Sequence, residues 1–357
     1  MNYKVLAMNF GSTSTKVAIY EGDKEVMIQT FRHTNEEMAN IHNMEENAAF
    51  RKGVIMSYLN EQGVDLTALD AIVGRGGLMR PIAGGTYIVN DNMLKDLHSC
   101  QYGYHVCNLG GILANEIGNE LGKPAFVVDP PVVNEVADVA KLSGHPDFPR
   151  RALFHALNQK AIAKRFAEET GRPYDSLNLI VAHMGGGTSV GCHRQGKVVD
   201  VNNGLEGEGA FTGERCGGLT ALDVVKATLS GQWGTTYAEI RHELCMKSGL
   251  VGHTGTNDGR EITRRIAEGD KKAELAYRTM AYQVSKEICA LAAPLAGKVD
   301  AILLTGGFAY DKVLMGWIEE YVGFLAPVHV YPGEDEMLAL AQGAIRVLSG
   351  KEVAKVY

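Results

Sequence analysis

Residues 4–20 read KVLAMNFGSTSTKVAIY, two apolar stretches joined by a loop of glycine, serine and threonine. Short apolar runs bounded by small turn residues are typical of β-strands. The pattern predicts a hairpin with strands over residues 4–8 and 16–20, then a strand near residues 25–31 and a helix over residues 48–61. Such a loop presents backbone N–H groups and small hydroxyls, the groups that bind phosphate without bulky side chains in the way.

The same pattern returns in the second half of the chain. Residues 179–194 read LIVAHMGGGTSVGCHR, and residues 186–189 match residues 11–14 at an offset of 175 positions. Residues 299–307 match residues 69–77 at an offset of 230 positions, with Asp, Ala, Ile, Gly and Gly identical. Either match alone is common by chance. Two in the same order predict a duplicated α/β domain whose second copy is longer by about 55 residues.

A stretch rich in glycine and proline, residues 143–149, marks the expected boundary between the two copies. We therefore expect a first lobe of residues 1–147 plus 333–357 and a second lobe of residues 148–332. The last helix, expected over residues 337–348, would cross back to the first lobe.

Composition excludes several classes of protein. A net charge of −7 over 357 residues argues against a general binder of nucleic acid or of anionic membranes. No apolar run approaches the roughly 18 residues needed to span a bilayer, and the N-terminal run is too short for a signal peptide, so a cytoplasmic protein is expected. The six cysteines contain no CxxC pair, which argues against a disulfide framework or a zinc knuckle. P-loop and Rossmann glycine motifs are missing as well.

Three short motifs carry a resemblance to a known superfamily: Asn9-x-Gly-Ser-Thr-Ser-x-Lys16, His183-x-Gly-Gly-Gly-x-Ser189 and Thr305-Gly306-Gly307. They resemble the two phosphate loops and the adenosine loop of the acetate and sugar kinase/Hsp70/actin superfamily. The resemblance narrows to the acetokinase family and, within it, to the butyrate kinases. Further stretches support it at residues 127–131, 153–161, 205–209, 255–258 and 331–336. The implied fold is α/β, a duplicated two-lobed actin-like ATPase with a ribonuclease H-like core in each lobe.

The function implied by the resemblance is reversible, ATP-dependent phosphorylation of a short-chain fatty acid to its acyl phosphate in the cleft between the lobes, with ATP/ADP and Mg²⁺ as cofactors. Butyrate is the expected acid, and acetate, propionate or a branched short-chain acid is the alternative. A nucleotide-binding chaperone or filament protein is the rival from another class. The resemblance also implies a homo-oligomer, at least a dimer, without nucleic-acid or membrane partners.

The chemistry of this reaction requires positive charge in the site. A carboxylate nucleophile is already ionised at pH 7, so no general base is needed. Its approach to the γ-phosphate costs about 4 kcal/mol per charge pair at 4 Å in a dielectric of about 20. The resemblance assigns the catalytic roles to Arg75, His105, Asp129, His155 and Arg215.

Each catalytic residue has an implied task. Arg215 stabilises the transferring phosphoryl group and His105 and His155 donate hydrogen bonds to its oxygens. Arg75 binds the carboxylate of the acid, with Arg80 as the alternative. The Asp129 carboxylate is implied to orient Mg²⁺ or its bound water rather than to cap a turn.

The remaining implied roles concern the metal, the nucleotide and the acid's alkyl tail. Glu336 is the second metal residue, with Glu334 and Asp335 as alternatives. Phe154 and Tyr104 are candidates for the wall around the alkyl tail, unless both belong to the core. The nucleotide-binding residues implied by the motifs are Asn9, Gly11, Ser12, Ser14, Lys16, His183, Gly185, Gly186, Gly187, Gly306 and Gly307.

Overall fold

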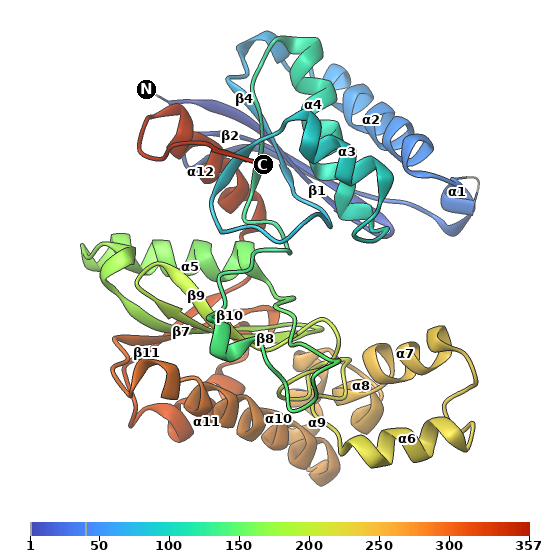
Figure 1. The fold of residues 1–357 in the computed structure, drawn as a ribbon, viewed down its shortest axis with the longest axis vertical. Helices are drawn as coiled ribbons and strands as arrows, with labels where there is room; N and C mark the ends of the chain where they lie inside the picture. Colours follow the sequence, from blue (N-terminus) through green and yellow to red (C-terminus); the bar gives the residue numbers. More distant parts are fainter. Residues whose placement is uncertain (1, 40) are drawn as a thin grey trace. The chain divides into compact units, whose positions relative to one another are not determined.

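The computed structural model describes residues 2–39 and 41–357. The chain forms two compact units, each with its own sheet (Figure 1). Unit 1 comprises Met1–Asn134 and Asp335–Tyr357, and unit 2 comprises Glu135–Glu334. No helix within the described part of the chain is long and apolar enough to cross a membrane.

Unit 1 is built on a seven-stranded sheet in the order β12-β5-β6-β4-β1-β2-β3. Its strands are β1 (Lys4–Gly11), β2 (Ser14–Glu21), β3 (Lys24–Arg32), β4 (Ala71–Arg75), β5 (Thr86–Ile88), β6 (Ala125–Val128) and β12 (Lys355–Val356). Its helices are α1 (Asn35–Ala39), α2 (Met44–Glu61), α3 (Asp91–Ser99), α4 (Leu109–Leu121) and α12 (Glu336–Leu348), with 3₁₀ turns at η1 (Leu66–Ala68) and η2 (Val106–Asn108).

Both faces of this sheet are covered. Val5, Leu6, Ala7 and Met8 alternate between the faces of β1, and all four are fully buried. Helices α4 and α12 pack on the central strands. A Cβ at Gly110 of α4 would lie 1.6 Å from the backbone oxygen of Arg75, so this close approach of helix to strand requires glycine.

Unit 2 is built on a five-stranded sheet in the order β11-β10-β7-β8-β9. Its strands are β7 (Asn178–Met184), β8 (Thr188–Arg194), β9 (Lys197–Val201), β10 (Ala301–Gly306) and β11 (Val328–Pro332). Its helices are α5 (Ala156–Thr170), α6 (Ala221–Leu229), α7 (Tyr237–Met246), α8 (Gly249–Thr254), α9 (Gly259–Ala267), α10 (Lys271–Ala290) and α11 (Lys312–Val322). Its 3₁₀ turns are η3 (Asp138–Ala140), η4 (Tyr174–Ser176), η5 (Ala293–Leu295) and η6 (Gly307–Tyr310).

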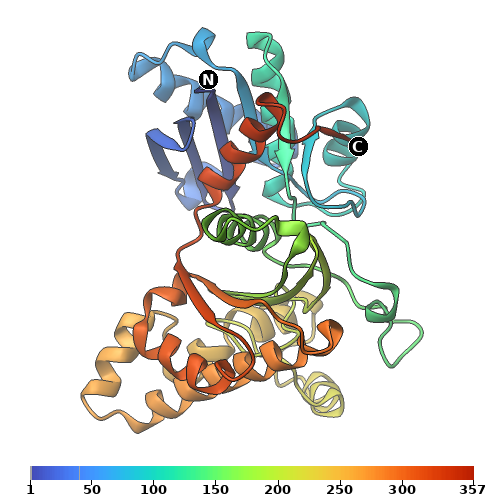
Figure 2. The ribbon, with the colours of Figure 1, turned by 90° about the vertical axis from the view of Figure 1, so that its left-hand side faces the viewer.

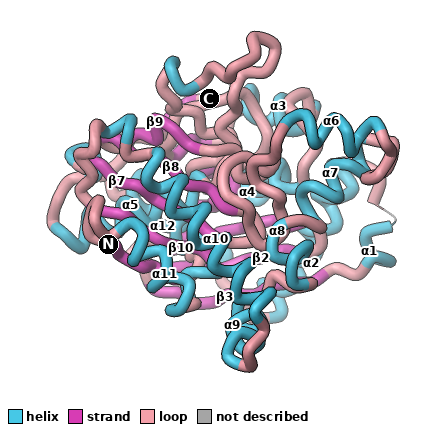
Figure 3. The backbone as a smooth tube through the Cα atoms, turned by 90° about the horizontal axis from the view of Figure 1, so that it is seen from below, coloured by secondary structure: helices cyan, strands magenta, loops and turns pink. Residues whose placement is uncertain are grey.

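Helices also cover both faces of the unit 2 sheet. Figure 2 shows α5 on one side of it and α10 and α11 on the other. Figure 3 shows α10 and α11 in front of the strands of this sheet, where α10 contacts β7 and β8 and α11 contacts β11. Buried residues of α10 and α11 form one apolar core with alternate residues of β7 and β10, among them Ile180, Ala182, Ile302 and Leu304.

The two sheets repeat one topology, as the internal matches predict. Strand β1 pairs antiparallel with β2 and parallel with β4. Strand β7 pairs in the same way with β8 and β10. The order β6-β4-β1-β2-β3 in unit 1 therefore corresponds to β11-β10-β7-β8-β9 in unit 2, and the expected hairpins and α/β fold class are confirmed.

Residues 135–147 group with unit 2, although the glycine- and proline-rich stretch at residues 143–149 favoured a later boundary. The reason lies in polar contacts that a composition cue does not reveal. The Glu135 carboxylate accepts a hydrogen bond from Val198 N at 2.9 Å and pairs with Lys160 at 2.9 Å. Ala137 N donates to Val199 O at 2.9 Å. The assignment of acid binding and nucleotide binding to separate lobes stays a prediction.

Candidate active site

The loop of the first hairpin carries the unit 1 residues expected to bind phosphate. Gly11 of β1 lies opposite Ser14 of β2, so Ser12 and Thr13 form an exposed turn between them. Asn9 and the half-buried Lys16 are register partners two positions further along the same ladder. The five predicted residues Asn9, Gly11, Ser12, Ser14 and Lys16 therefore share one hairpin.

A buried arginine that we did not predict supports this loop. Arg51 of α2 is fully buried and donates from Nη2 to Ser12 O at 3.0 Å, and from Nη1 to Ser14 O and to Thr15 Oγ1. Its Nε donates to Asn47 Oδ1 at 2.8 Å. Burial lowers the pKa of Arg51 to about 10, so the guanidinium remains charged beneath the loop at neutral pH.

The sequence does contain a signal for Arg51. It falls on the apolar stripe of α2 that also carries Met44, Ala48, Ile55 and Leu59, all of which are buried. A charged residue on the apolar side of an amphipathic helix points to a buried, hydrogen-bonded role.

The predicted acid-binding arginine and metal carboxylate of unit 1 contact each other. Arg75, the last residue of β4, pairs through Nη1 with Glu336 Oε2 at 3.1 Å, and Asn9 Nδ2 donates to the same oxygen at 2.6 Å. This cluster joins β1, β4 and the first residue of α12. The alternative arginine, Arg80, instead stacks over the ring of Tyr357 at 4.2 Å.

Asp129 directly follows β6 in an unusual backbone conformation. Its φ is 39°, in the left-handed region that non-glycine residues seldom adopt, and its side chain is 2% exposed. Its Oδ1 accepts from Gly85 N at 2.7 Å, while its own N donates to Gly85 O at 3.1 Å. The carboxylate is thus held in a defined orientation.

His105 directly precedes the 3₁₀ turn η2 as its N-cap residue and is exposed. Its Nδ1 accepts from Cys107 N at 3.2 Å and lies 2.9 Å from Cys107 Sγ. The neighbouring Tyr104 is 60% exposed, so it is not a core residue of unit 1. In unit 2, Phe154 is 2% exposed, as expected of a core aromatic.

The second hairpin loop, residues 185–187 of unit 2, lies against Arg215. A Cβ at Gly187 would lie 2.6 Å from the backbone oxygen of Gly204 and 2.5 Å from Arg215 Nη1, so the backbone requires glycine here and Arg215 uses the space that glycine leaves. Arg215 Nε donates to Leu205 O at 3.2 Å, whereas its buried Nη1 has no hydrogen-bond partner among the described residues. Burial lowers the pKa of the Arg215 guanidinium. A buried, unsatisfied N–H beside a glycine loop is suited to an anionic ligand.

Two predicted histidines of unit 2 stack on one another. The rings of His155, just before α5, and His183, in β7, lie 3.8 Å apart between centroids at 13°. His155 Nδ1 is 2.9 Å from Ser189 Oγ. His183 lies between Asn158 Oδ1, 2.7 Å from its Nδ1, and Glu334 Oε1, 3.5 Å from its Nε2.

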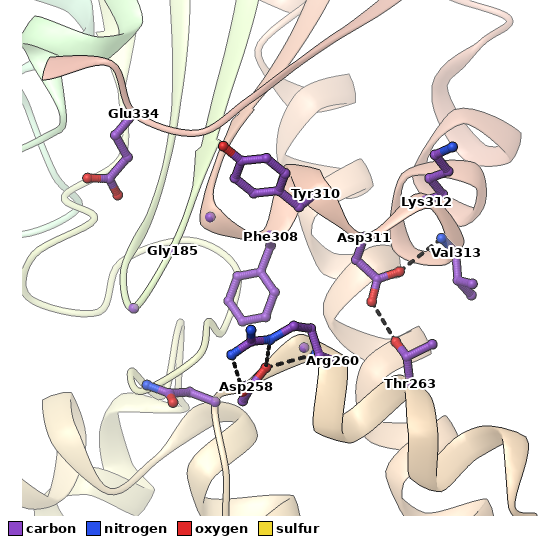
Figure 4. Close-up of a pocket in the computed structure, with 14 residues that line it drawn as sticks. Gly185, Asp258, Arg260, Thr263, Phe308, Tyr310, Asp311, Lys312, Val313 and Glu334 are labelled. Carbon is purple, nitrogen blue, oxygen red and sulfur yellow. Dashed lines mark hydrogen bonds and ion pairs between the residues drawn. The ribbon is translucent and has the colours of Figure 1, made fainter.

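A pocket of about 880 Å³ opens beside the second glycine loop (Figure 4). Four residues singled out from the sequence line it: Gly185, Gly186, Gly307 and Glu334. Its other lining residues are Asn257, Asp258, Gly259, Arg260, Thr263, Phe308, Tyr310, Asp311, Lys312 and Val313. The volume is that of a site for a ligand the size of a nucleotide.

Most of these further lining residues were missed, although they adjoin motifs. Arg260 pairs with Asp258 at 2.8 Å, two residues after the stretch at 255–258. Asp311 caps α11 and accepts hydrogen bonds from Thr263 and from Tyr277. The position of residues 308–313 directly after the glycine motif at residues 306–307 was the signal that could have identified them, because the loop that follows such a motif lines the same pocket as the motif.

Comparison with known proteins places these features in a family. A model of the acetokinase family matches residues 147–315. Over 357 residues, covering 100% of both chains, this chain is 52% identical to a protein named probable butyrate kinase from Clostridium botulinum (strain Eklund 17B / Type B). It is 51% identical, with the same coverage, to butyrate kinase 2 of Clostridium acetobutylicum.

The crystal structure of Porphyromonas gingivalis acetate kinase aligns with a TM-score of 0.78 at 19% identity, covering 97% of this chain and 100% of that one. The fold is therefore that of the acetate kinases. The chain belongs to the acetokinase family.

Proposed function

We propose that this protein is a kinase of short-chain fatty acids that transfers the γ-phosphoryl group of ATP to butyrate, forming butanoyl phosphate and ADP. Full-length identity of about half to proteins named butyrate kinase supports the reaction class and the acid. The observation that best supports this chemistry is the buried Nη1 of Arg215, which lies beside Gly187 and has no hydrogen-bond partner in the described part of the chain.

In this proposal unit 2 binds the nucleotide. The pocket beside Gly185, Gly186 and Gly307 has the volume for it, and Figure 4 shows the Phe308 ring among the residues that line it. Phosphates at the glycine loop would meet Arg215, whose guanidinium stabilises the charge on the transferring phosphoryl group. His155 and His183 would then contact phosphate oxygens from the start of α5 and from β7.

In this proposal unit 1 binds the acid and contributes the first phosphate loop. Arg75 would bind the carboxylate, and its ion pair with Glu336 holds the guanidinium in place until the acid arrives. Because the carboxylate is already ionised, no residue of the chain needs to remove a proton. Arg80 is less suited, since its guanidinium is stacked on Tyr357.

Magnesium is also proposed, with ATP. The described residues contain no group of three or more potential metal ligands, which fits an ion held by phosphate oxygens, water and one or two carboxylates. Asp129 and Glu336 supply the hard oxygen donors for this role, and Glu336 shares its Oε2 with Arg75 and Asn9. When bound, Mg²⁺ neutralises phosphate charge.

We propose in addition a cytoplasmic homo-oligomer. All six cysteines are free thiols, as is usual in a reducing compartment. Helix α6 exposes Leu222, Val225 and Leu229, with Leu219 just before it, an apolar surface that a second copy of the chain would cover. Light scattering of the wild type and of Leu222→Lys tests this: the variant should have the lower mass.

A coupled assay of ADP release tests the proposed reaction. With ATP and Mg²⁺, release should depend on added butyrate. A non-catalytic nucleotide-binding protein of the same fold would give no acid-dependent release.

A further inference from the structure

A chain of hydrogen-bonding side chains runs through unit 2 behind His155. Gln159, Ser189 and His193 are fully buried within it. At the end far from His155, the Tyr174 hydroxyl is hydrogen-bonded to His193 Nδ1 at 2.7 Å, and His193 Nε2 is hydrogen-bonded to Gln159 Oε1 at 3.1 Å. Gln159 Nε2 is in turn hydrogen-bonded to Ser189 Oγ at 2.9 Å, and Ser189 Oγ to His155 Nδ1 at 2.9 Å. The direction of each bond follows from the chemistry of its partners.

The orientation of the Gln159 side-chain amide determines which groups of this chain donate and which accept hydrogen bonds. Its Nε2 also lies 2.9 Å from the backbone oxygen of Ser189, which only accepts hydrogen bonds, so the amide nitrogen must face Ser189. Its Oε1 consequently faces His193 and requires a hydrogen on His193 Nε2. Burial lowers the pKa of His193 to about 3, so the ring is neutral and its Nδ1 accepts from the Tyr174 hydroxyl.

The hydrogen bonds of the Ser189 hydroxyl then determine which nitrogen of His155 accepts. A serine hydroxyl has two lone pairs and one hydrogen. The Oγ accepts from Gln159 Nε2 at 2.9 Å and from the backbone N–H of His155 at 3.3 Å. Its hydrogen is therefore donated to His155 Nδ1, and the hydrogen of the neutral His155 ring lies on Nε2.

The geometry around Gln159 is supported by a neighbouring glycine. A Cβ at Gly191 would lie 2.2 Å from Gln159 Oε1 and 3.2 Å from His193 Nε2. The side chains of Gln159 and His193 can meet only because residue 191 has no side chain.

The stacked partner of His155 has the opposite arrangement. Asn158 Nδ2 donates to Glu334 O at 2.7 Å, so Asn158 Oδ1 faces His183 and accepts from Nδ1–H. In its neutral form His183 thus carries its hydrogen on Nδ1, whereas neutral His155 carries its hydrogen on Nε2.

We propose that Gln159, oriented by Ser189 and His193, is a positioning residue that fixes His155 in the Nε2–H tautomer, so that this N–H donates a hydrogen bond to the phosphoryl group being transferred. The role in transfer rests on the proposed function, whereas the tautomer does not. Fixing a donor in advance stabilises developing charge without reorganisation during the reaction.

Nitrogen-15 NMR of the full-length wild-type protein, labelled at histidine, tests the tautomer at pH 8. The His155 signals are assigned by their loss in His155→Gln. We expect one neutral species with a pyrrole-type Nε2 and a pyridine-type Nδ1. A pyrrole-type Nδ1, or a mixture of tautomers, would overturn the proposal, and this measurement needs no variant to retain activity.

The roles of the chain residues are tested by two variants. Gln159→Met keeps the side chain's length but removes both hydrogen-bonding atoms, so Ser189 can turn and both tautomers of His155 should appear, with a lower kcat and an unchanged KM for the acid. Tyr174→Phe is the matched control. It should keep the single Nε2–H signature, because the Ser189 carbonyl still orients Gln159.

Retention of a single Nε2–H species in Gln159→Met, or its loss in Tyr174→Phe, would contradict the assigned direction. If instead no acid is phosphorylated by the wild type, the proposed function fails while the tautomer result stands. The two failures are therefore distinguishable.

Discussion

The imidazole rings of His155 and His183 lie face to face, 3.8 Å apart between centroids, although the two residues come from different elements of unit 2. Their outer partners differ, Ser189 for His155 and Asn158 with Glu334 for His183. The two stacked rings are therefore oriented by separate sets of hydrogen-bonding partners.

Replacing Arg215 tests the proposed stabilisation of the phosphoryl group. Arg215→Ala should lower kcat by at least ~10³, about 4 kcal/mol of transition-state stabilisation, with little change in nucleotide affinity. Steady-state kinetics and nucleotide titration measure the two quantities. Arg264→Ala is the control, because Arg264 pairs with Glu261 and Glu268 on the surface of the same unit. A kcat above a tenth of the wild-type value in Arg215→Ala would refute the role.

Asp129→Asn tests whether this residue serves the metal. Asparagine tolerates the left-handed φ of 39° and can still accept from Gly85 N, so the fold is preserved while the charge is removed. The Mg²⁺ concentration needed for half-maximal rate should rise as the rate falls. A slow variant with an unchanged Mg²⁺ dependence would show that Asp129 acts in another way.

Arg51→Met tests the support of the first phosphate loop. The substitution leaves the backbone oxygens of Ser12 and Ser14 without their buried donor, which should cost about 3 kcal/mol of stability. We expect a lower Tm and a higher KM for ATP. The control is Lys52→Met on the same helix, which removes surface pairs with Glu116 and Glu120 and should have little effect on either. Equal behaviour of the two variants would disprove the role of Arg51.

Acid should destabilise the protein partly through His193. Its folded pKa of about 3 lies below the ordinary value of 6.5, so between these values the unfolded chain binds a proton that the folded chain does not. The stability contribution is present above pH 6.5 and is lost as pH falls toward 3, at up to about 1.4 kcal/mol per pH unit. In denaturant unfolding across this pH range, the free energy of unfolding of His193→Gln should fall less steeply with decreasing pH than that of the wild type. An equal pH dependence in the two proteins would contradict a buried, neutral His193.

Much of the fold could be predicted from short patterns. The hairpins at residues 4–20 and 179–194 and the match between residues 69–77 and 299–307 were enough to predict the duplicated topology, because hydrophobic alternation along a strand is a local property. The domain boundary was less predictable. Glu135 joins unit 2 through a carboxylate that meets Lys160 and a backbone N–H of β9, contacts between distant segments that no local pattern encodes.

The candidate site was predictable where motifs named its residues and less so elsewhere. The stacking of His155 on His183, and the ion pair of Arg75 with Glu336 across 261 positions, depend on tertiary packing. Arg51, Gln159 and His193 act through other residues rather than on a ligand. Arg51 lies on the apolar stripe of α2 and Gln159 lies within the stretch at residues 153–161, but neither pattern assigns them a role. Their hydrogen bonds, and those of His193, show what they do.

The alkyl tail of the acid gives a further prediction. Each methylene removed from water contributes about 0.8 kcal/mol, so a pocket sized for four carbons should prefer butyrate over acetate by about 1.6 kcal/mol, or roughly fifteenfold in kcat/KM. Longer acids should lose this advantage through overpacking. Kinetics with acetate, propionate, butyrate, isobutyrate and valerate measure the order, and a maximum at acetate would contradict butyrate as the preferred acid.

The most direct test of the account is to trap the acyl phosphate itself. Hydroxylamine converts an acyl phosphate to its hydroxamate, which is measured by colour with ferric ion after incubating the protein with ATP, Mg²⁺ and each short-chain acid. We expect hydroxamate in amounts matching the ADP released, with butyrate as the best substrate. Absence of hydroxamate with every acid, from a folded protein that binds ATP, would contradict the claim that this chain phosphorylates a carboxylate.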